Sequence, residues 1–177
     1  MSALGIFAKW EPVYRRIGLE PCPIKPGGKA CKVRGWQRPH NEIDPAELDR
    51  WLTAYPDHGI GLRMGTPLPG RGRLGAIDVD DDRYVDVARA LLRDPKSCRI
   101  GSKGITCFVR VFDNLPNATF KSKGGHRRSN NQIVDCLFDR KLCVIPPTIH
   151  PDTKKPYRWI GTPLHELNLD LLPILGA

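Results

Sequence analysis

One stretch of the chain combines the pattern of a half-buried strand with two carboxylates. In Leu74–Asp82, apolar residues lead in, and Ile77 and Val79 then alternate with Asp78 and Asp80. A period of two is typical of a strand with one buried face, so both carboxylates are expected on the same side. The pattern therefore predicts a strand that presents a pair of acids.

The hydrophobic pattern also predicts helices and strands on both sides of this stretch. The expected helices are 4–16, with a kink or stop at Pro12, 44–56 and 83–93. In the second of these, Asp44 is expected to cap the helix, Pro45 to take its first position, and the Glu47 side chain to reach back to the start of the helix. The expected strands are 20–24 on a sheet edge, 59–64, 98–100, 105–111 and 132–137. Residues 114–131 are expected to form a polar loop. A tight turn that pairs 59–64 with the acidic strand is expected to place Arg63 near the acids.

Length and composition bound the class of protein. A chain of 177 residues fits one domain, and no apolar run approaches the roughly 18 residues of a membrane helix, so a cytoplasmic protein with no membrane partner is expected. The net charge of +9 favours a polyanionic partner, nucleic acid first. The six cysteines show no C-x-x-C spacing, which favours buried free thiols over zinc ligands or disulfides, and no zinc is expected.

The paired acids point to metal chemistry. Two carboxylates two residues apart on a strand repel each other unless a cation lies between them or one takes a proton. Hard oxygen ligands suit Mg²⁺ or Mn²⁺, and two such ions can activate an attacking oxygen and stabilise a leaving one in phosphoryl transfer. Asp135 lies inside the apolar stretch 132–137, and a metal shared with Asp78 and Asp80 would give that charge a partner. For Asp81 and Asp82, the alternative is capping of the next helix.

Several basic and polar residues are candidates for contacts with phosphate. Lys29 ends the turn Lys25–Lys29, which either cradles phosphate with its backbone amides or is a plain turn. Thr106 and Arg110 share one face of the strand 105–111 and can address one ligand. The loop 114–131 holds its own basic residues, namely Lys121, Lys123, His126, Arg127 and Arg128, and it is either a solvated loop or a clamp on nucleic acid or triphosphate.

In their order and spacing, these pieces resemble the N-terminal domain of bifunctional primase/polymerases, the prim-pol branch of the archaeo-eukaryotic primase superfamily. The similarity is carried by Pro23–Lys29 with Gly35-Trp36, His58–Gly65, Ala76–Asp80, Ile100–Arg110, Val134-Asp135, and Ile145–Pro151 with Tyr157-Arg158-Trp159. It implies a compact α/β (α+β) domain over 1–177, with a modified RNA-recognition-like mixed or antiparallel sheet flanked by helices. The chain is then the N-terminal part of a longer replication protein or a protein of its own.

The resemblance also implies an activity and a site. Family members join nucleotides on a DNA template, often without a primer, and commonly lie beside a helicase in plasmid, phage or integrated-element replication proteins. By position, Asp78 and Asp80 match the first acidic motif and Asp135 the third, so that they would hold two Mg²⁺ or Mn²⁺ ions around an NTP or dNTP and the growing 3′ oxygen. His150 lies in a stretch that would shape the nucleotide pocket or form a structural turn.

The middle motif departs from the usual family pattern. Most members carry a serine followed by a histidine that contacts the triphosphate, whereas this chain has Ser102 and then Thr106 about where the histidine belongs. Lys103 or Arg110 could supply the positive contact that is missing.

Three functions therefore stay open. The first is a template-directed nucleotidyltransferase that acts on single-stranded DNA. The second is a catalytically weak module that binds nucleotide or single-stranded DNA for a replication machine. The third is a metal-dependent nuclease, which would degrade DNA without a triphosphate.

Overall fold

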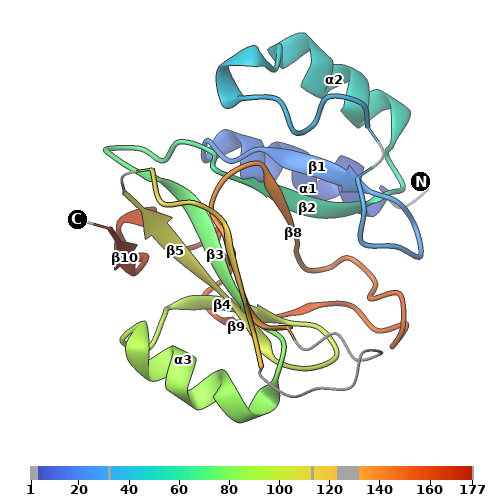
Figure 1. Ribbon diagram of the computed structural model, residues 1–177. Coiled ribbons are helices and arrows are strands. Elements are labelled where there is room, and N and C mark those ends of the chain that lie inside the picture. The colour runs from blue at the N-terminus through green and yellow to red at the C-terminus, as the bar shows by residue number, and fades with distance from the viewer. Residues whose placement is uncertain (1–3, 32, 113, 123–131, 177) are drawn as a thin grey trace.

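The protein folds into two sheets and flanking helices, as a computed structural model describes it for residues 4–31, 33–112, 114–122 and 132–176 (Figure 1). The helices are α1 Ile6–Arg16, α2 Pro45–Ala54 and α3 Val85–Leu91, with short 3₁₀ helices at His40–Glu42, Asp82–Tyr84 and Leu169–Leu171; the strands are β1 Pro21–Ile24, β2 Gly59–Met64, β3 Arg73–Val79, β4 Ser97–Ile100, β5 Ile105–Val111, β6 Ala118–Lys121, β7 Gln132–Leu137, β8 Lys141–Val144, β9 Arg158–Gly161 and β10 Ile174–Leu175. The expected mixed α+β fold in one compact domain is confirmed.

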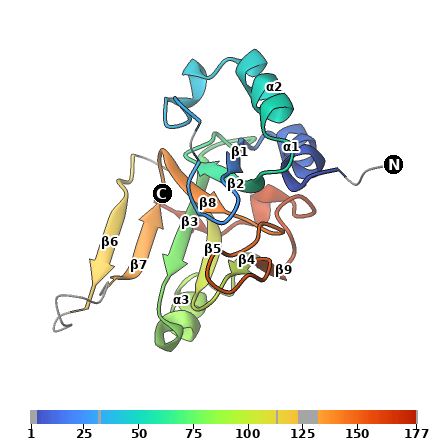
Figure 2. The ribbon, with the colours of Figure 1, turned by 90° about the vertical axis from the view of Figure 1, so that its right-hand side faces the viewer.

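The larger sheet carries the acidic strand at its centre. Its strands follow the order β6-β7-β3-β5-β4-β9, all antiparallel to their neighbours, and β10 adds a short parallel pairing to β5. Figure 2 shows β6 and β7 at one side of this sheet and α3 below it. Strand β3 is hydrogen-bonded on both edges, which fixes its register and the direction of every side chain on it.

Each face of the larger sheet covers its own hydrophobic core. On one face, Ala76 and Phe108 pack against α1 and the smaller sheet, in a core that also contains Phe7, Tyr14 and Leu62. On the other face, the odd-numbered residues of β3 and β5 pack against α3 and its flanks; this core contains Val79, Ile105, Cys107, Val109 and Leu92. The side chains of Asp78 and Asp80 point to the first face, the one that the smaller sheet partly covers.

The smaller sheet has the order β1-β2-β8, with β1 on an edge as expected from its two prolines. It lies between α1, α2 and the larger sheet (Figure 1). All six cysteines are free, which confirms the prediction of free thiols, and Cys98 and Cys107 face each other across β4 and β5 with their sulfur atoms 3.1 Å apart. No helix among the described residues is long and apolar enough to cross a membrane.

Some predictions about local structure were wrong. The expected loop 114–131 contains strand β6, which pairs with β7 at the sheet edge. Strand β2 pairs with β1 and β8 and not with β3, so Arg63 lies away from the acids, where it forms an ion pair with Glu20. Asp44 caps α2 as expected, its carboxylate accepting from the amide of Ala46 at 2.9 Å, but the Glu47 carboxylate binds Arg38 and not the helix start.

Candidate active site

Asp78, Asp135 and two further polar residues form one row across the larger sheet. Asp78 on β3 lies directly opposite Asp135 on β7 and, on its other edge, directly opposite Thr106 on β5. Thr106 in turn lies opposite Arg99 on β4. Directly opposed residues of antiparallel strands present their side chains on the same face. The sheet therefore brings together two carboxylates, a hydroxyl and a guanidinium that are up to 57 positions apart in the sequence.

Gln132 links the acidic residues of two strands. Its side-chain amide donates to the Asp80 carboxylate at 2.9 Å and also to the Asp135 carboxylate. The backbone amide of Asp80 donates to the carbonyl of Ile133 at 2.9 Å, which ties the end of β3 to the start of β7. One oxygen of Asp135, Oδ1, is buried and has no hydrogen-bond partner among the described residues. The three predicted acids thus lie side by side, and one of them has a free buried oxygen.

Asp80 has an environment that disfavours its negative charge. Burial raises the pKa of its carboxyl, and the negative charges of Asp78 and Asp135 raise it further, while the positive charges of Lys103 and Lys29 partly offset them. Carboxylates this close resist full ionisation unless positive charge is placed among them. A divalent cation is one such charge, and hard oxygen donors suit Mg²⁺ or Mn²⁺.

Arg99 is a candidate site residue that sequence reasoning missed. Its guanidinium lies 3.7 Å from the Asp78 carboxylate and 4.8 Å from the ring centre of Tyr157, above whose face it stacks. The Nε atom of Arg99 is buried, and no residue that the structure describes forms a hydrogen bond with it. The signal in the sequence was a single arginine inside the short apolar strand 98–100, but only the strand pairing shows that it faces the acids.

Asp78 and Arg99 of the row line a cavity of about 180 Å³ that gathers most of the predicted nucleotide-binding residues, whereas Asp135 lines a separate small cavity. The lining of the first cavity includes both β3 acids together with Arg99 and Tyr157, and it adds the predicted Lys29, Ser102, Lys103 and His150. Thr106 does not line this cavity, but its hydroxyl donates to the carboxylate of Asp78, which does. Three positively charged side chains therefore surround the same space as the acids, an arrangement suited to a polyphosphate held by cations.

His150 lies in this lining in its neutral form. Its ring nitrogen Nδ1 accepts hydrogen bonds from the backbone amides of Asp152 at 3.2 Å and Thr153 at 3.4 Å, which leaves the other ring nitrogen free to donate. Burial lowers the pKa of the imidazole, and the nearby positive charges of Lys29 and Arg99 lower it further. His150 can therefore act as a neutral donor at pH 7.

The remaining predicted residues lie elsewhere or are not described. Arg110 is buried four positions from Thr106 and donates to the carbonyls of Pro69 and Leu169 and to the Asp170 carboxylate, so the structure does not bring it together with the acids. Lys121 is exposed at the end of β6, opposite Gln132. Lys123, Arg127 and Arg128 lie outside the described residues, as does His126.

A comparison of the sequence with protein-family models identifies the family of the chain. The family model "Bifunctional DNA primase/polymerase, N-terminal" matches residues 12–173, which include every acid of the row. The chain belongs to this prim-pol family. Its domain is therefore of the DNA primase/polymerase type of nucleotidyltransferase, a class that is generally divalent-metal dependent and acts on DNA and nucleotides. No curated protein matches the chain.

The prim-pol domain has a second hollow next to the acids. This hollow of about 450 Å³ is lined by Asp80–Arg83, Lys103, Ser122 and Gln132–Ile133. Asp81 caps the short helix that follows, which was the alternative prediction for this residue. Its carboxylate accepts a hydrogen bond from the backbone amide of Arg83 at 3.0 Å, and the contacts with Arg83 lower the pKa of Asp81 to about 2. Asp82 accepts from the Gly104 amide at 2.6 Å.

The fit of this site to metal ions rests on the donor set. The free buried oxygen of Asp135, beside the opposed Asp78, is the kind of donor that a hard cation takes. Within the described ranges, however, no group of three or more acidic, histidine or cysteine side chains is arranged as a metal site. Hydrogen bonds from Thr106 and Gln132 occupy carboxylate oxygens of the row. The two predicted Mg²⁺ or Mn²⁺ ions therefore stay a prediction.

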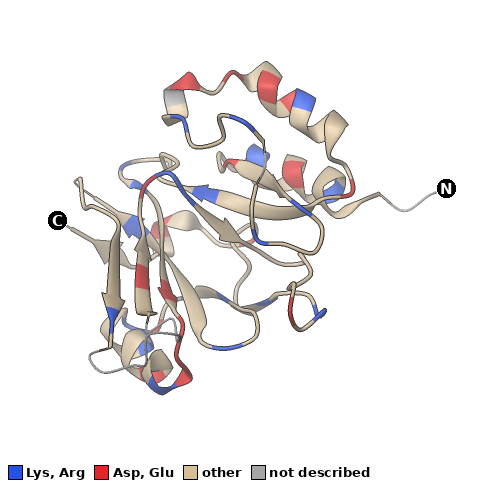
Figure 3. Cartoon of the chain, turned by 45° about the vertical axis from the view of Figure 1, so that its right-hand side comes forward, with Lys and Arg blue, Asp and Glu red and all other residues tan. Residues whose placement is uncertain are grey.

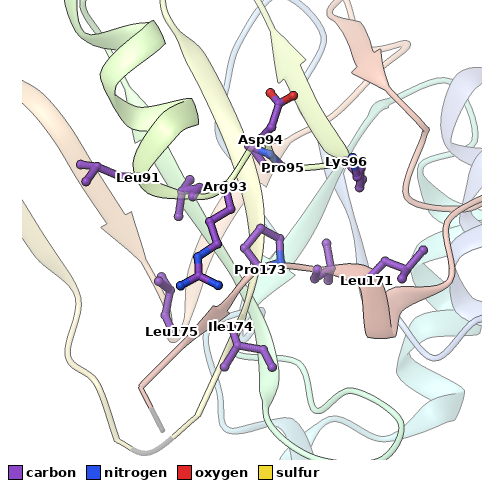
Figure 4. Close-up of a pocket in the computed structure, with 11 residues that line it drawn as sticks. Leu91, Arg93, Asp94, Pro95, Lys96, Leu171, Pro173, Ile174 and Leu175 are labelled. Carbon is purple, nitrogen blue, oxygen red and sulfur yellow. The ribbon is translucent and has the colours of Figure 1, made fainter.

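A larger cavity of about 590 Å³ lies apart from this chemistry. It is formed between the end of α3 and the C-terminal segment and is lined by residues 91–96 and 171–175 (Figure 4). Its lining is mostly leucine and proline, with Arg93 and Lys96 beside them, and none of the predicted site residues contributes to it. Size alone therefore does not locate the candidate active site of this domain.

Proposed function

We propose that this domain is a template-directed nucleotidyltransferase that extends a strand from NTPs or dNTPs on single-stranded DNA. The observation that carries the proposal is the pairing of Asp78 with Asp135 across β3 and β7, with Asp80 beside them. Asp78 and Asp80 line a cavity that Lys29, Lys103 and Arg99 also line. Membership of the prim-pol family and the net charge of +9 support it. The anionic template, the triphosphate and the metal ions would meet at the only part of the large sheet where opposed acids lie among the described residues.

The chain's own residues divide the work of the proposed reaction. Asp78, Asp80 and Asp135 would hold the two ions, with the free Oδ1 of Asp135 as one donor. When bound, such ions lower the pKa of the attacking 3′ oxygen and neutralise charge on the transferring phosphoryl group. Lys29 and Lys103, which both line the cavity, would neutralise the remaining phosphate charge.

The remaining polar residues would position the reactants. Ser102 and neutral His150 donate hydrogen bonds to the triphosphate, a role for which both are placed in the cavity lining. Thr106 holds Asp78 through its hydroxyl, so it acts on the metal ligand and not on the triphosphate. Arg99 would supply the positive contact with the triphosphate that the usual histidine makes, because its guanidinium lines the cavity beside Asp78.

The direct test is nucleotide incorporation on labelled single-stranded templates with Mn²⁺ or Mg²⁺, with and without a primer. Products longer than a dinucleotide without a primer establish priming, and products only with a primer establish polymerisation alone. Loss of the labelled DNA without any triphosphate requirement would identify a nuclease instead. Absence of any product, with triphosphate binding retained, would contradict the proposal.

A second candidate function is a module that binds nucleotide or single-stranded DNA without joining nucleotides. It is favoured by the hydrogen bonds that already occupy carboxylate oxygens in the row, and by Thr106 in place of the histidine. Replacing Asp78 and Asp80 by alanine separates the two candidates, since it abolishes extension in the first and leaves strand binding nearly unchanged in the second. A helicase partner and a plasmid or phage context are further parts of the proposal that rest on the family resemblance. A cytoplasmic location is proposed as well, from the lack of a membrane-length apolar run in the sequence.

A further inference from the structure

A second basic surface lies at the loop that precedes α2, away from the acids. Residues 33–39 of this loop and Arg140 of the β7–β8 turn line a groove of about 540 Å³. The groove holds the half-buried ring of Trp36 and the guanidinium groups of Arg34, Arg38 and Arg140. It contains no acidic side chain in its lining. We call this surface the Trp36 groove.

The backbone of the Trp36 groove is held in place from below by a buried charge. Arg63 on β2 is 2% exposed, and its guanidinium donates to the carbonyl of Arg38 at 2.6 Å and to that of Trp36 at 3.4 Å. Glu20 balances the charge of Arg63 in an ion pair. A buried charge is costly unless it is paired and hydrogen-bonded. Here the buried pair orders the loop, so the groove is formed before any ligand arrives.

Arg38 gives the groove one wall. Its guanidinium folds back over the loop, donating to the carbonyl of Gly35 at 3.0 Å and to the Glu47 carboxylate at 2.6 Å. Gly35 makes this possible, since it has φ +83° and a Cβ there would lie 2.7 Å from the Arg38 Nε. The charge of Arg38 is therefore largely satisfied within the protein.

Arg34 and Arg140 keep charge available for a ligand. Within the described residues, Arg34 has no hydrogen bond or ion pair, and its side chain is exposed. Arg140 is 59% exposed and donates only through Nε, to the Asp139 carboxylate at 3.1 Å, which leaves its terminal nitrogens free among the described contacts. Figure 3 marks the basic residues of these segments in blue. Two cations thus line the same groove as an aromatic ring.

We propose that the Trp36 groove binds single-stranded DNA, with Arg34 and Arg140 on phosphates and a base against Trp36. Sequence-tolerant binders of single strands combine a positively charged groove with an aromatic ring on which a base stacks. The guanidinium group suits phosphate because it donates two parallel hydrogen bonds. The Trp36 groove is a different surface from the predicted nucleic-acid contacts in residues 114–131. Its Arg140 lies in the turn that follows β7, at the opposite end of the paired strands β6 and β7 from Lys121 and Gln132.

The position of the groove fits a path for the template. Arg140 follows Asp135 by five residues, which is at most about 17 Å along an extended chain. Lys141, the next residue, lines a small cavity together with Asp135. Lys29, which lines the acidic cavity, belongs to the same connection between β1 and the 3₁₀ helix His40–Glu42 as Trp36. The template role of this groove rests on the proposed nucleotidyltransferase function, whereas strand binding itself does not require it.

The test measures binding of a fluorescein-labelled oligo-dT to the whole chain, without nucleotide or metal, at several salt concentrations. Replacing both Arg34 and Arg140 by alanine is expected to weaken binding at least tenfold and to reduce the slope of log affinity against log salt by about 1.4, since each phosphate contact on a single strand contributes about 0.7. The matched control replaces Arg93 and Lys96 by alanine, which removes the same charge at the cavity of Figure 4.

A second readout addresses Trp36 directly. Oligo-dT is expected to quench the tryptophan emission of the chain, and Trp36→Phe, which keeps an aromatic ring in the packing, is expected to remove most of that quenching. Any of three outcomes would overturn the inference. The Arg34 and Arg140 double variant could bind oligo-dT within twofold of the unchanged chain, the control variant could lose as much affinity as the double variant, or Trp36→Phe could show undiminished quenching.

The same variants separate this inference from the proposed function. If the chain binds oligo-dT through the groove but incorporates no nucleotide, the groove stands and the nucleotidyltransferase proposal fails. If the chain incorporates nucleotides, and the double variant reaches half-maximal rate at the same template concentration as the unchanged chain, the groove proposal fails and the activity stands.

Discussion

Asp78 on β3 and Asp135 on β7 are directly opposed residues of neighbouring antiparallel strands, and their side chains lie on the same face of the sheet. Like charges in that position destabilise a sheet. The fold retains this pair at the rim of a core, in reach of Thr106, Gln132 and Arg99, and one oxygen of Asp135 has no hydrogen-bond partner within the described part of the chain. Such an arrangement is costly for stability and useful for binding cations.

Gln132 is expected to control the metal affinity of the site. Its amide holds Asp80 and Asp135 together, so Gln132→Ala should weaken Mn²⁺ binding by about 10- to 100-fold, the range found when residues that orient metal ligands are removed. Titration calorimetry with Mn²⁺ measures this without any turnover. Unchanged Mn²⁺ affinity in the alanine variant would show that the amide plays no part in ordering the acids.

Thr106 is expected to serve Asp78 through its hydroxyl. The residue is fully buried, and Thr106→Val keeps its shape but removes the donor to a charged acceptor, which should lower the free energy of unfolding by about 1.5–3 kcal/mol. Thr106→Ser keeps the hydroxyl and should cost less. Urea denaturation of the two variants is the measurement. Equal losses in the valine and serine variants would assign the effect to packing alone.

The same position tests the departure from the family pattern. Because the Thr106 side chain is fully enclosed, Thr106→His would require more space than the sheet provides. The variant is therefore expected to lose stability, by about 1–3 kcal/mol in urea denaturation, without gaining incorporation activity. A histidine variant that is stable and more active than the unchanged chain would show that the site lacks only the usual triphosphate contact.

His150 is expected to make stability depend on pH. Its folded-state pKa lies below the ordinary 6.5, so the unfolded chain binds the proton more readily. Its contribution to stability is complete above pH 6.5 and is lost as the pH falls below that value toward the folded-state pKa. His150→Asn, which keeps an acceptor near Nδ1, should flatten this part of the profile in urea denaturation between pH 5 and 8. A variant with the same slope as the unchanged chain would place the titrating group elsewhere.

The strands that carry the acids were predictable because each has a strong local pattern. Asp78 and Asp80 alternate with Ile77 and Val79, and Asp135 interrupts an apolar run. Both strands, and the carboxylates that stand out in them, could therefore be predicted from the sequence alone. The resemblance to the prim-pol family then assigned Asp78 and Asp80 to the first acidic motif and Asp135 to the third. That they meet was a prediction which the strand register supports.

The pairing of distant strands was not predictable from local patterns. Nothing in 59–64 says whether it joins the acidic strand or a separate sheet, and the short distance in sequence favoured the wrong answer for Arg63. Strand β6 was missed because only one edge of it is paired and its residues are largely exposed, which leaves no alternation to read. Arg99 and Gln132 gained meaning only when the register placed them beside the acids.

The central claim is that Asp78 and Asp135 act as one metal-dependent site for joining nucleotides. The most direct measurement is extension of a labelled primer on single-stranded DNA with Mn²⁺ by Asp78→Asn and Asp135→Asn, with Asp86→Asn on the exposed face of α3 as the control for charge. The account predicts a loss of about 100-fold or more in both site variants, an unchanged rate in the control and oligo-dT binding retained in all three. Extension by either site variant at the rate of the unchanged chain would contradict it.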